Sequence, residues 1–503
     1  MASTSCRHRT NDRAMLKLLP GLLIVVLAGP PVQAAETGMR DDAAKALRRG
    51  VEFFRNEVAH EGTYLWQYSA DLSKREGEGV ATETQGWVQP PGTPAVGLAL
   101  LAAWEATGDP FHLDAARETA YGLIQGQLRS GGWTYVIDTS PTGRERYAYR
   151  RGGSEQGRNI STLDDDTTQS ALRFLVQLDR ELKFADNQVR ESVRYALEAL
   201  LSVQYPNGAW SQGFEGPPDP GRFPVTKASH PERWPWKWPG SQQYWFRYTF
   251  NDNSLADAIE LMFLVEEVYS DPRAGAPFNE LAERCRTAAE KAGGFILLAQ
   301  LPEPQPAWAQ QYDFDMHPSW ARKFEPPAVT GGESQGVLRT LLMLYRMTAD
   351  RRFLEPVPRA IEYLQRSRLP DGRFARFYEL ETNRPLYFTK DYELTYDDSD
   401  VPTHYSFKVG DQTESILKEY RRLEGLSREE LGRARGDDPS KLTAALTEAV
   451  GRIIATQDDR GRWVEDGPMR YHRPKDSAGQ VINVGTFNRH VVTLSEFLRA
   501  SRP

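Results

Sequence analysis

The feature that most constrains the fold of this chain is a short motif that recurs between long amphipathic stretches. In each copy a glutamine is followed by a turn rich in glycine or proline and then by an aromatic residue. The copies span residues 127–133, 204–210, 365–374 and 457–463, with a degenerate copy at 300–308. Each copy follows a stretch with the helical apolar period, so the pattern predicts a helix, a tight turn and a return helix.

Helix pairs repeated in this way cannot bury their apolar faces singly, and such pairs commonly close into a ring. We therefore predict an all-α fold, an α/α toroid with an incomplete ring as one form, long irregular loops and few strands. The expected helices cover residues 40–58, 93–107, 111–129, 167–182, 188–203, 254–269, 278–299, 333–348, 353–366, 412–422 and 441–456. Few strands are expected, around 132–138 and 374–380.

The N-terminus has the layout of a secretory signal peptide. Lys17 precedes the apolar run 18–28, and the small-residue ending 32–35 follows it. We predict that residues 1–35 are removed and that the mature protein is secreted or periplasmic. An uncleaved anchor is the alternative, although the apolar run is too short to span a bilayer.

After the signal peptide we expect a toroidal domain at 36–424, a charged linker at 425–440 and a C-terminal helix pair at 441–503, packed on the toroid. The formal net charge of −7 argues against non-specific binding to nucleic acid or to an anionic membrane. Cys285 is the only cysteine outside the predicted signal peptide, so no intrachain disulfide is expected. We expect a monomer.

Three acidic sites are candidates for chemistry: Asp164 to Asp166, Asp252 between two asparagines, and Asp313 with Asp315. The first two precede predicted helices, where Asp and Asn are common N-caps, so capping alone is one interpretation. Three consecutive acids exceed what a cap requires, and clustered carboxylate and amide oxygens suit Ca²⁺. Because no linear EF-hand loop is present, any calcium site must be assembled from separate loops.

Basic and aromatic residues gather in other segments. Residues 307–337 combine aromatic residues, acids and Arg322 with prolines that prevent a helix, so they predict a long ordered loop. Arg373, Arg376, Arg384 and Lys390 follow further along the chain. Arginine pairs bidentately with carboxylates and aromatic faces stack on sugar rings, so these segments suit an acidic polysaccharide, although solvated surface charge is the simpler alternative.

Two irregular insertions interrupt the repeat, at 212–246 and 383–408. The first is rich in tryptophan and proline, and both are too aromatic for disorder. Its aromatic residues either line a sugar-binding cleft or pack the loop against the helical body, and the sequence leaves both open. They are Trp234, Trp236, Trp238, Tyr244 and Trp245.

Five motifs, at 161–175, 204–208, 249–252, 318–326 and 375–386, occur in the same order as motifs of pectate lyases. The chain thereby resembles the family-ten polysaccharide lyases, also called pectic acid lyases. The resemblance implies an α/α toroid that cleaves polygalacturonate by calcium-assisted β-elimination, giving 4,5-unsaturated products. It implies that Arg322 is the catalytic residue that abstracts the C5 proton, whereas residue chemistry alone suggests an electrostatic clamp, because arginine is a poor base.

The resemblance also suggests binding roles. Asp164, Asp165 and Asp252 are the predicted metal ligands, for Ca²⁺ bound together with substrate. The predicted substrate contacts are Arg376, Lys390, Arg384, Asp252, Trp320 and Tyr312. Asp165, Asp166 and Lys390 depart from the residues usual in the family, which leaves the identity of the uronate open.

Two other functions are compatible with the same residues. One is a glycoside hydrolase on an α/α toroid, with Asp164 and Asp252 as its carboxylate pair. The other is a non-catalytic carbohydrate-binding protein. Only a lyase forms a new double bond, so ultraviolet absorbance of the products separates the lyase from the hydrolase, whereas a binding protein would bind oligogalacturonate without turnover.

Overall fold

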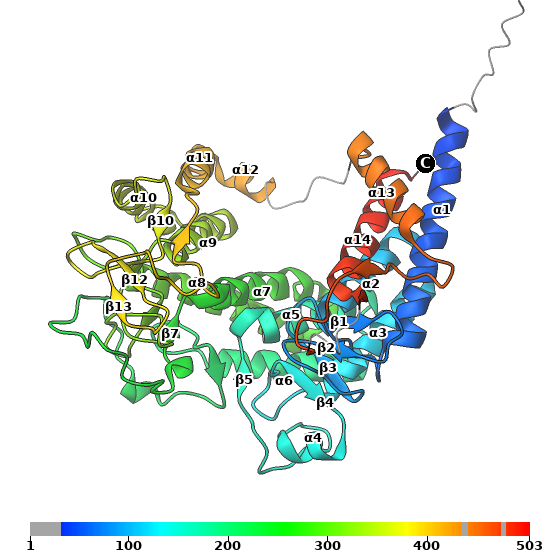
Figure 1. Ribbon diagram of the computed structural model, residues 1–503, viewed down its shortest axis with the longest axis horizontal. Helices are drawn as coiled ribbons and strands as arrows, with labels where there is room; N and C mark the ends of the chain where they lie inside the picture. The colour runs from blue at the N-terminus through cyan, green and yellow to red at the C-terminus, as the bar shows by residue number, and fades with distance from the viewer. Residues whose placement is uncertain (1–31, 434–440, 474–478, 503) are drawn as a thin grey trace, which may run out of the picture.

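The computed structural model describes residues 32–433, 441–473 and 479–502. Within these residues the chain forms helical hairpins arranged in an open arc (Figure 1). In chain order, the first and second helices of the successive units are α1 (Val32–Phe53) and α2 (Thr93–Thr107), α3 (Pro110–Gln125) and α5 (Thr167–Glu181), α6 (Asn187–Ser202) and α7 (Ser254–Tyr269), α8 (Ala276–Ala299) and α9 (Glu333–Thr348), α10 (Val357–Arg366) and α11 (Thr413–Glu424), and α13 (Ala444–Thr456) and α14 (Val484–Ala500). The predicted α/α toroid is thus confirmed, and the ring is incomplete.

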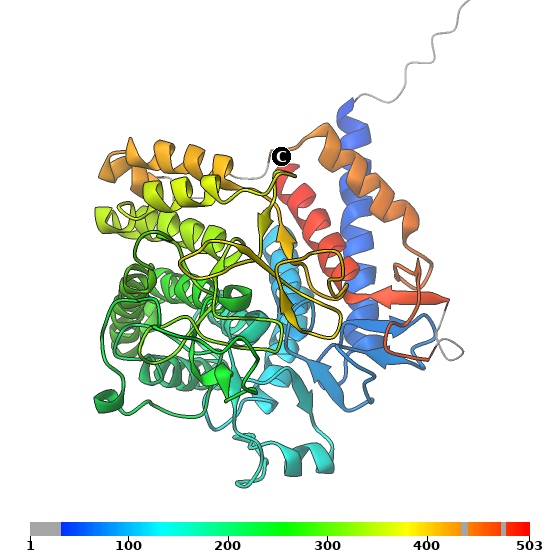
Figure 2. The ribbon, with the colours of Figure 1, turned by 60° about the vertical axis from the view of Figure 1, so that its left-hand side comes forward.

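The second helices of the hairpins form the inner layer. There α14 packs on α2, α2 on α5, α5 on α7, α7 on α9 and α9 on α11, while α3, α6 and α8 pack successively on the outside. Figure 2 shows the green, yellow and orange helices stacked side by side, with blue α1 and red α14 standing apart from them. The predicted helix ranges 93–107, 254–269 and 333–348 coincide with α2, α7 and α9.

The repeated motif has one structural role in four of its copies. The tryptophan indole donates a hydrogen bond back to a carbonyl of the preceding helix, so the ring is buried under the turn. These bonds run from Trp133 to Leu123, Trp210 to Leu200, Trp308 to Ile296 and Trp463 to Ile453, at 2.8 to 2.9 Å. The copy at 365–374 ends on Phe374 and has no indole to donate.

The glutamine of the motif joins one hairpin to the next. Its amide bonds its own turn and a carbonyl of a neighbouring hairpin: Gln127 reaches Ser192 in α6 at 3.0 Å, and Gln204 reaches Ala288 in α8 at 2.9 Å. Gln457, which follows α13, reaches Ala46 in α1 at 2.8 Å. The C-terminal hairpin therefore lies before the first hairpin in the arc, although it is last in the sequence.

The C-terminal segment is tied to the N-terminal one by a strand as well. Strand β16 (Gln480–Asn483) pairs antiparallel with β1 (Gln67–Ser69). The gap in the arc accordingly falls between α11 and α13 (Figure 1). Of the predicted linker 425–440, residues 428–433 form α12 (Arg428–Arg433), and 434–440 lie outside the described residues.

The strands are short and shape the loops. The others are β2 (Arg75–Glu76), β3 (Gln85–Trp87), β4 (Val136–Asp138), β5 (Ser161–Thr162), β6 (Gly213–Phe214), β7 (Tyr248–Thr249), β8 (Gln311–Tyr312), β9 (Val329–Thr330), β10 (Phe374–Ala375), β11 (Phe377–Tyr378), β12 (Pro385–Phe388), β13 (Leu394–Thr395), β14 (Lys408–Val409) and β15 (Glu465–Asp466). The larger sheets have the orders β15-β16-β1-β2 and β13-β12-β11-β9. The pairs β5–β6 and β7–β8 brace the two acidic turns described below.

Residues 1–31 of the predicted signal peptide lie outside the described residues, and helix α1 begins at Val32. Among the described residues, no helix has the length and apolar character needed to cross a membrane. Cys285 is a buried free thiol in α8.

Candidate active site

The N-termini of the inner helices share one face of the arc. Gln89, just before α2, donates a 2.9 Å hydrogen bond to Asp165, just before α5. The turn before α5 packs on the turn before α7, which in turn contacts α9. Because the N–H groups at a helix N-terminus carry partial positive charge, this face favours anions.

Two acidic turns with the same backbone form the centre of this face. The turns η2 (Asp164–Asp166) and η5 (Asn251–Asn253) each place two successive residues in the left-handed region, at φ 48° and 57° for Asp165 and Asp166 and at φ 46° and 55° for Asp252 and Asn253. Asp and Asn tolerate this conformation better than other non-glycine residues. The Asp and Asn clusters of the sequence therefore build two matching turns, and none of the three aspartate side chains of η2 caps α5.

Three carboxylates converge between the two turns. One oxygen from each of Asp164, Asp165 and Asp252 lies within 4.8 Å of the others. The Tyr135 hydroxyl donates to one oxygen of Asp164 at 2.6 Å, while the other oxygen is buried and accepts no hydrogen bond from any described residue. A buried carboxylate oxygen without a donor is costly unless a cation or water satisfies it, so this donor set fits a hard divalent cation.

Burial and the closeness of the three carboxylates also raise pKa values in the cluster. Burial, together with the charges of Asp164 and Asp252, raises the pKa of Asp165 to about 7. Desolvation by surrounding atoms and the charge of Asp164 raise the pKa of the more exposed Asp252 to about 6. Like charges held this close disfavour full ionisation, and a bound cation would relieve that repulsion.

Asp166, the third acid of its run, is oriented away from this cluster. Its carboxylate forms a bidentate pair with Arg173 in α5, with bonds of 2.8 and 3.1 Å. The run of three aspartates thus divides into two members of the cluster and one partner of an arginine.

Arg322 lies across from the acidic cluster, in the long loop between α8 and α9. Its positive charge offsets part of the rise in the pKa of Asp165 and of Asp252, both of which stay above the ordinary value. The guanidinium is bonded bidentately to the buried Glu325, with Nε–Oε2 at 2.8 Å and Nη2–Oε1 at 2.5 Å. Burial disfavours the charge on Arg322, but the bonds with Glu325 outweigh burial and raise the pKa of Arg322 above its ordinary value.

A network continues from this pair to a second arginine. The Tyr405 hydroxyl donates to Glu325 at 3.0 Å, and Arg376 donates to the Tyr405 oxygen at 2.8 Å and to Glu333 at 2.9 Å. Glu333 is the first residue of α9, so the network ends at the same helix N-termini. The structure thereby brings the predicted Arg322 and Arg376 into one site.

The sequence interpretation missed three members of this network. Glu325 lies in the motif 318–326, and no role is predicted for it from the sequence. Its spacing of three residues from Arg322 is the one feature of the sequence that could have indicated an ion pair. Glu333 and Tyr405 had no such signal, because only the tertiary structure places the loop of Tyr405 against Arg376.

Two predicted substrate contacts are wrong. Tyr312 is fully buried: its hydroxyl donates to Ala299 and accepts from the amide of Ala309, both at 2.7 Å. Trp320 is 5% exposed, and its indole donates to Pro235 at 2.7 Å. Both rings face the core because they hold the loop in place, so neither can stack on a sugar.

Two predicted contacts lie outside the network. Lys390 is exposed and pairs with Asp400 at 2.7 Å. The guanidinium of Arg384 stacks 3.4 Å from the ring centroid of Tyr396. Both belong to the second insertion. Asp313, of the third acidic site, caps its own turn by accepting from the amides of Asp315 and His317.

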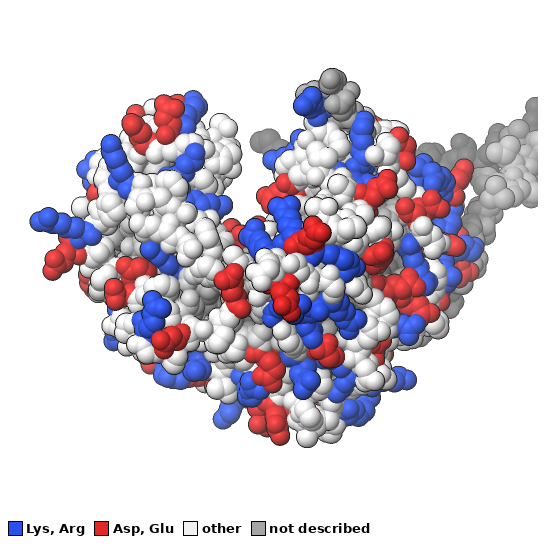
Figure 3. All heavy atoms as spheres, turned by 90° about the horizontal axis from the view of Figure 1, so that it is seen from below, with Lys and Arg blue, Asp and Glu red and all other residues white. Residues whose placement is uncertain are grey.

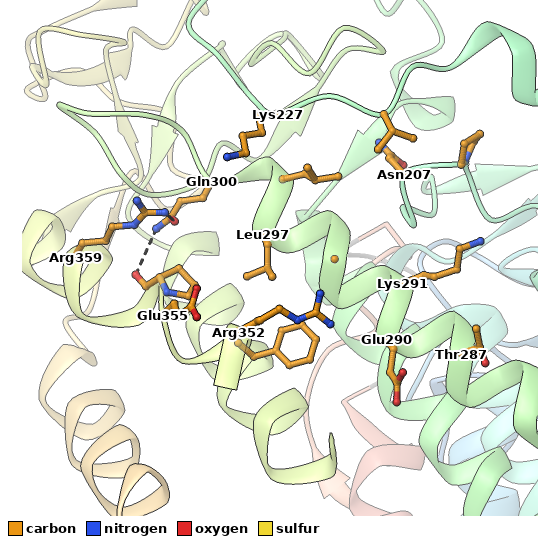
Figure 4. A pocket seen from close by; sticks show the side chains of 16 residues that line it. Asn207, Lys227, Thr287, Glu290, Lys291, Leu297, Gln300, Arg352, Glu355 and Arg359 are labelled. Atoms are coloured by element: carbon orange, nitrogen blue, oxygen red, sulfur yellow. Dashed lines mark hydrogen bonds between the residues drawn. The ribbon is translucent and has the colours of Figure 1, made fainter. Parts of the chain in front are cut away.

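Figure 3 shows a notch between two lobes of the molecule, with acidic and basic side chains along it. A small pocket of about 190 Å³ lies beside Asp164 and is also lined by Tyr135, Tyr244 and Trp245. A larger pocket of about 780 Å³ lies elsewhere, between α8 and the start of α10, and none of its lining residues belongs to the cluster or the network (Figure 4).

Comparison with known proteins agrees with this geometry. A family model described as pectic acid lyase matches residues 127–373, the segment that contains both acidic turns and Arg322. This match supports a polysaccharide lyase as the class of protein. The resemblance to the pectic acid lyase family, seen in the sequence motifs, is confirmed over residues 127–373.

No curated relative matches the sequence. Solved structures similar to the chain include a family 10 polysaccharide lyase from Cellvibrio cellulosa, at 22% identity over 65% of this chain and 98% of that chain, with a TM-score of 0.44. A mutant of that enzyme in complex with trigalacturonic acid matches at 22% identity over 66% and 99% of the chains, with a TM-score of 0.43. Cellobiose 2-epimerase from Bacillus thermoamylovorans matches at 12% identity over 92% and 99%, with a TM-score of 0.42.

Proposed function

We propose that this protein is an exported lyase that cleaves polygalacturonate by calcium-assisted β-elimination. The observation that carries the proposal is the arrangement of a cationic Arg322 opposite three converging carboxylates, at the N-termini of four inner helices. The family match over the same residues supports the reaction class. Export is proposed from the N-terminal residues 1–35.

The reaction explains why both charges are needed. A base, the role that the family resemblance gives Arg322, takes the C5 proton, which is α to the uronate carboxylate, and negative charge builds on that carboxylate. The C4–O bond then breaks to leave a C4–C5 double bond, and the departing glycosidic oxygen takes up a proton and becomes the hydroxyl of the other fragment. Asp164, Asp165 and Asp252 would hold Ca²⁺, which supplies charge stabilisation at the substrate carboxylate. Arg322 and Arg376 supply positive charge from the other side, and the helix N-termini add to it.

The pairing of Arg322 with Glu325 bears on its role. The ion pair raises the pKa of Arg322, so the residue is held protonated before substrate binds. Electrostatic stabilisation of the substrate carboxylate is compatible with this state. Abstraction of the C5 proton by Arg322, which the family resemblance implies, requires the guanidinium first to lose a proton that Glu325 stabilises.

The test is product formation from polygalacturonate, followed by ultraviolet absorbance and by product mass. We expect unsaturated products that disappear with a chelator, and an Arg322→Ala rate lowered by about 10²- to 10³-fold or more. The exposed Arg284, which pairs with Glu198 on the outer surface, provides the matched control Arg284→Ala. Cleavage that tolerates both the chelator and Arg322→Ala would contradict the mechanism.

A hydrolase is the second candidate, with Asp164 and Asp252 as the carboxylate pair. One oxygen of each lies within 4.8 Å of the other, whereas the carboxyl groups of an inverting glycosidase stand roughly 6.5–9.5 Å apart to leave room for a water. The inverting hydrolase is thus the less compatible of the two enzymes. Saturated products of water addition would support hydrolysis, and binding without products would support a carbohydrate-binding protein.

A further inference from the structure

The first insertion exposes aromatic rings beside the loop that carries Arg322. Trp236 is 40% exposed, and Tyr396, from the second insertion, is 36% exposed. Trp236 stacks on Trp234 at 5.5 Å between ring centroids and meets Tyr396 at 5.6 Å. We call Trp234, Trp236 and Tyr396 the aromatic platform. Trp234 is half-buried and packs against the core, whereas Trp236 and Tyr396 are exposed and adjoin each other. Adjoining exposed aromatic rings indicate an interaction site.

Two indole hydrogen bonds fasten the platform to the Arg322 loop. Trp238 donates to the carbonyl of Ala321 at 2.9 Å, and Trp320 donates to the carbonyl of Pro235 at 2.7 Å. Ala321 directly precedes Arg322. The platform and the catalytic candidate are therefore held in one rigid unit, which suits adjacent parts of a single binding surface.

A cation lies on the far side of the platform. The guanidinium of Arg384 stacks on Tyr396, 3.4 Å from the ring centroid, and Tyr396 is fixed in turn by a 2.7 Å bond from its hydroxyl to Glu379. Arg384 is exposed, and among the described residues no carboxylate pairs with its guanidinium. Stacking orients the planar group and leaves its edge donors available to a carboxylate.

We propose that the aromatic platform and Arg384 form a remote subsite for one uronic acid residue of a polysaccharide, away from the bond that is cleaved. The C–H face of the sugar would lie on Trp236, and its carboxylate would bond Arg384. The proposal rests on the proposed function for the identity of the polymer. It explains why these rings stay exposed, whereas Trp245 of the same insertion buries its indole nitrogen.

The test compares a long substrate with a short one. Purified wild type and Trp236→Ala are assayed on polygalacturonate and on trigalacturonate. In Trp236→Ala, the half-saturating concentration of the polymer should rise relative to wild type. The factor of this rise should be about three to ten times the factor for the trisaccharide, which is the range that loss of one aromatic contact gives. Trp236→Phe should restore most of the difference, since it keeps a ring at the position.

The control removes an exposed aromatic ring elsewhere. Tyr471 is 39% exposed near the C-terminal sheet, and its hydrogen bond to Glu76 comes from the backbone amide, which the substitution keeps. The half-saturating concentrations of Tyr471→Ala should therefore match those of wild type on both substrates. Arg384→Gln removes the charge and keeps the aromatic rings. Because salt screens charges, this variant should weaken polymer binding more at low salt than at high salt.

Affinity electrophoresis in gels that contain polygalacturonate tests the subsite without catalysis. Retardation of wild type but not of Trp236→Ala would support the subsite. If no unsaturated products form as well, only the lyase function is overturned. If Trp236→Ala is retarded like wild type and keeps its polymer preference, the subsite is overturned while the lyase function stands.

Discussion

The guanidinium of Arg322 and the carboxylate of Glu325 form a bidentate ion pair three residues apart, with the shorter bond at 2.5 Å. Glu325 is 2% exposed, and it also accepts from the backbone amide of Arg322. The loop therefore fixes the orientation of Arg322 locally, before any contact with the acidic cluster.

Replacement of Glu325 by Gln should both destabilise the protein and lower activity. The change leaves Arg322 without its counter-charge, and because that arginine is partly exposed we expect a cost of about 1–3 kcal/mol in the free energy of unfolding. Denaturant unfolding measures this cost. The surface pair Arg284–Glu198 provides the control, since Glu198→Gln should cost about 0–1 kcal/mol. Equal costs for the two variants would contradict a special role for the buried pair.

Calcium should stabilise the folded protein through the three carboxylates. At a calcium concentration 100-fold above its dissociation constant, binding adds about 2.7 kcal/mol to stability, which thermal unfolding with and without chelator detects. Asp164→Asn should abolish the calcium-dependent increase in Tm. Asp166→Asn should retain it, because Asp166 pairs with Arg173 rather than with the cluster. The loss of the increase in both variants would show that the site is not the one assigned.

Without calcium, stability should fall as the pH rises through the titration of the cluster. The pKa of Asp165 is raised from 3.8 to about 7, so between about pH 4 and 7 the folded state binds more protons than the unfolded state. The free energy of unfolding therefore decreases with pH over that range. Chemical denaturation at several pH values in chelator checks this slope, and it should be shallower in Asp165→Asn. An unchanged slope in that variant would assign the effect to other groups.

Tyr312 should affect stability and not substrate binding. Tyr312→Phe removes the bond to Ala299 and leaves the amide of Ala309 without its acceptor, at a cost of about 1–3 kcal/mol. The half-saturating polygalacturonate concentration should stay at the wild-type value. Urea unfolding and initial rates measure the two quantities, with Tyr471→Phe as the exposed control. A raised half-saturating concentration without a change in stability would restore the substrate contact predicted from the sequence.

Much of the local structure could be predicted because it depends on neighbours in the chain. Helices α2, α7 and α9 match their predicted ranges, since apolar period and capping are short-range properties. The motif of glutamine and tryptophan marked the hairpin turns correctly for the same reason. Tyr312 and Trp320 were misassigned because an aromatic residue in a loop has the same sequence signature whether it faces a ligand or the core.

Local patterns in the chain specify the kind of unit, a helical hairpin with a tryptophan-capped turn, and the acidic composition of the two turns at Asp164 and Asp252. The order of the hairpins, with the C-terminal pair beside α1, and the convergence of Asp164, Asp165 and Asp252 come from tertiary packing. Tertiary packing also brings Tyr405 to the Arg322–Glu325 pair and leaves Trp236 exposed. These features depend on the approach of segments that are distant in the chain, which no local pattern encodes.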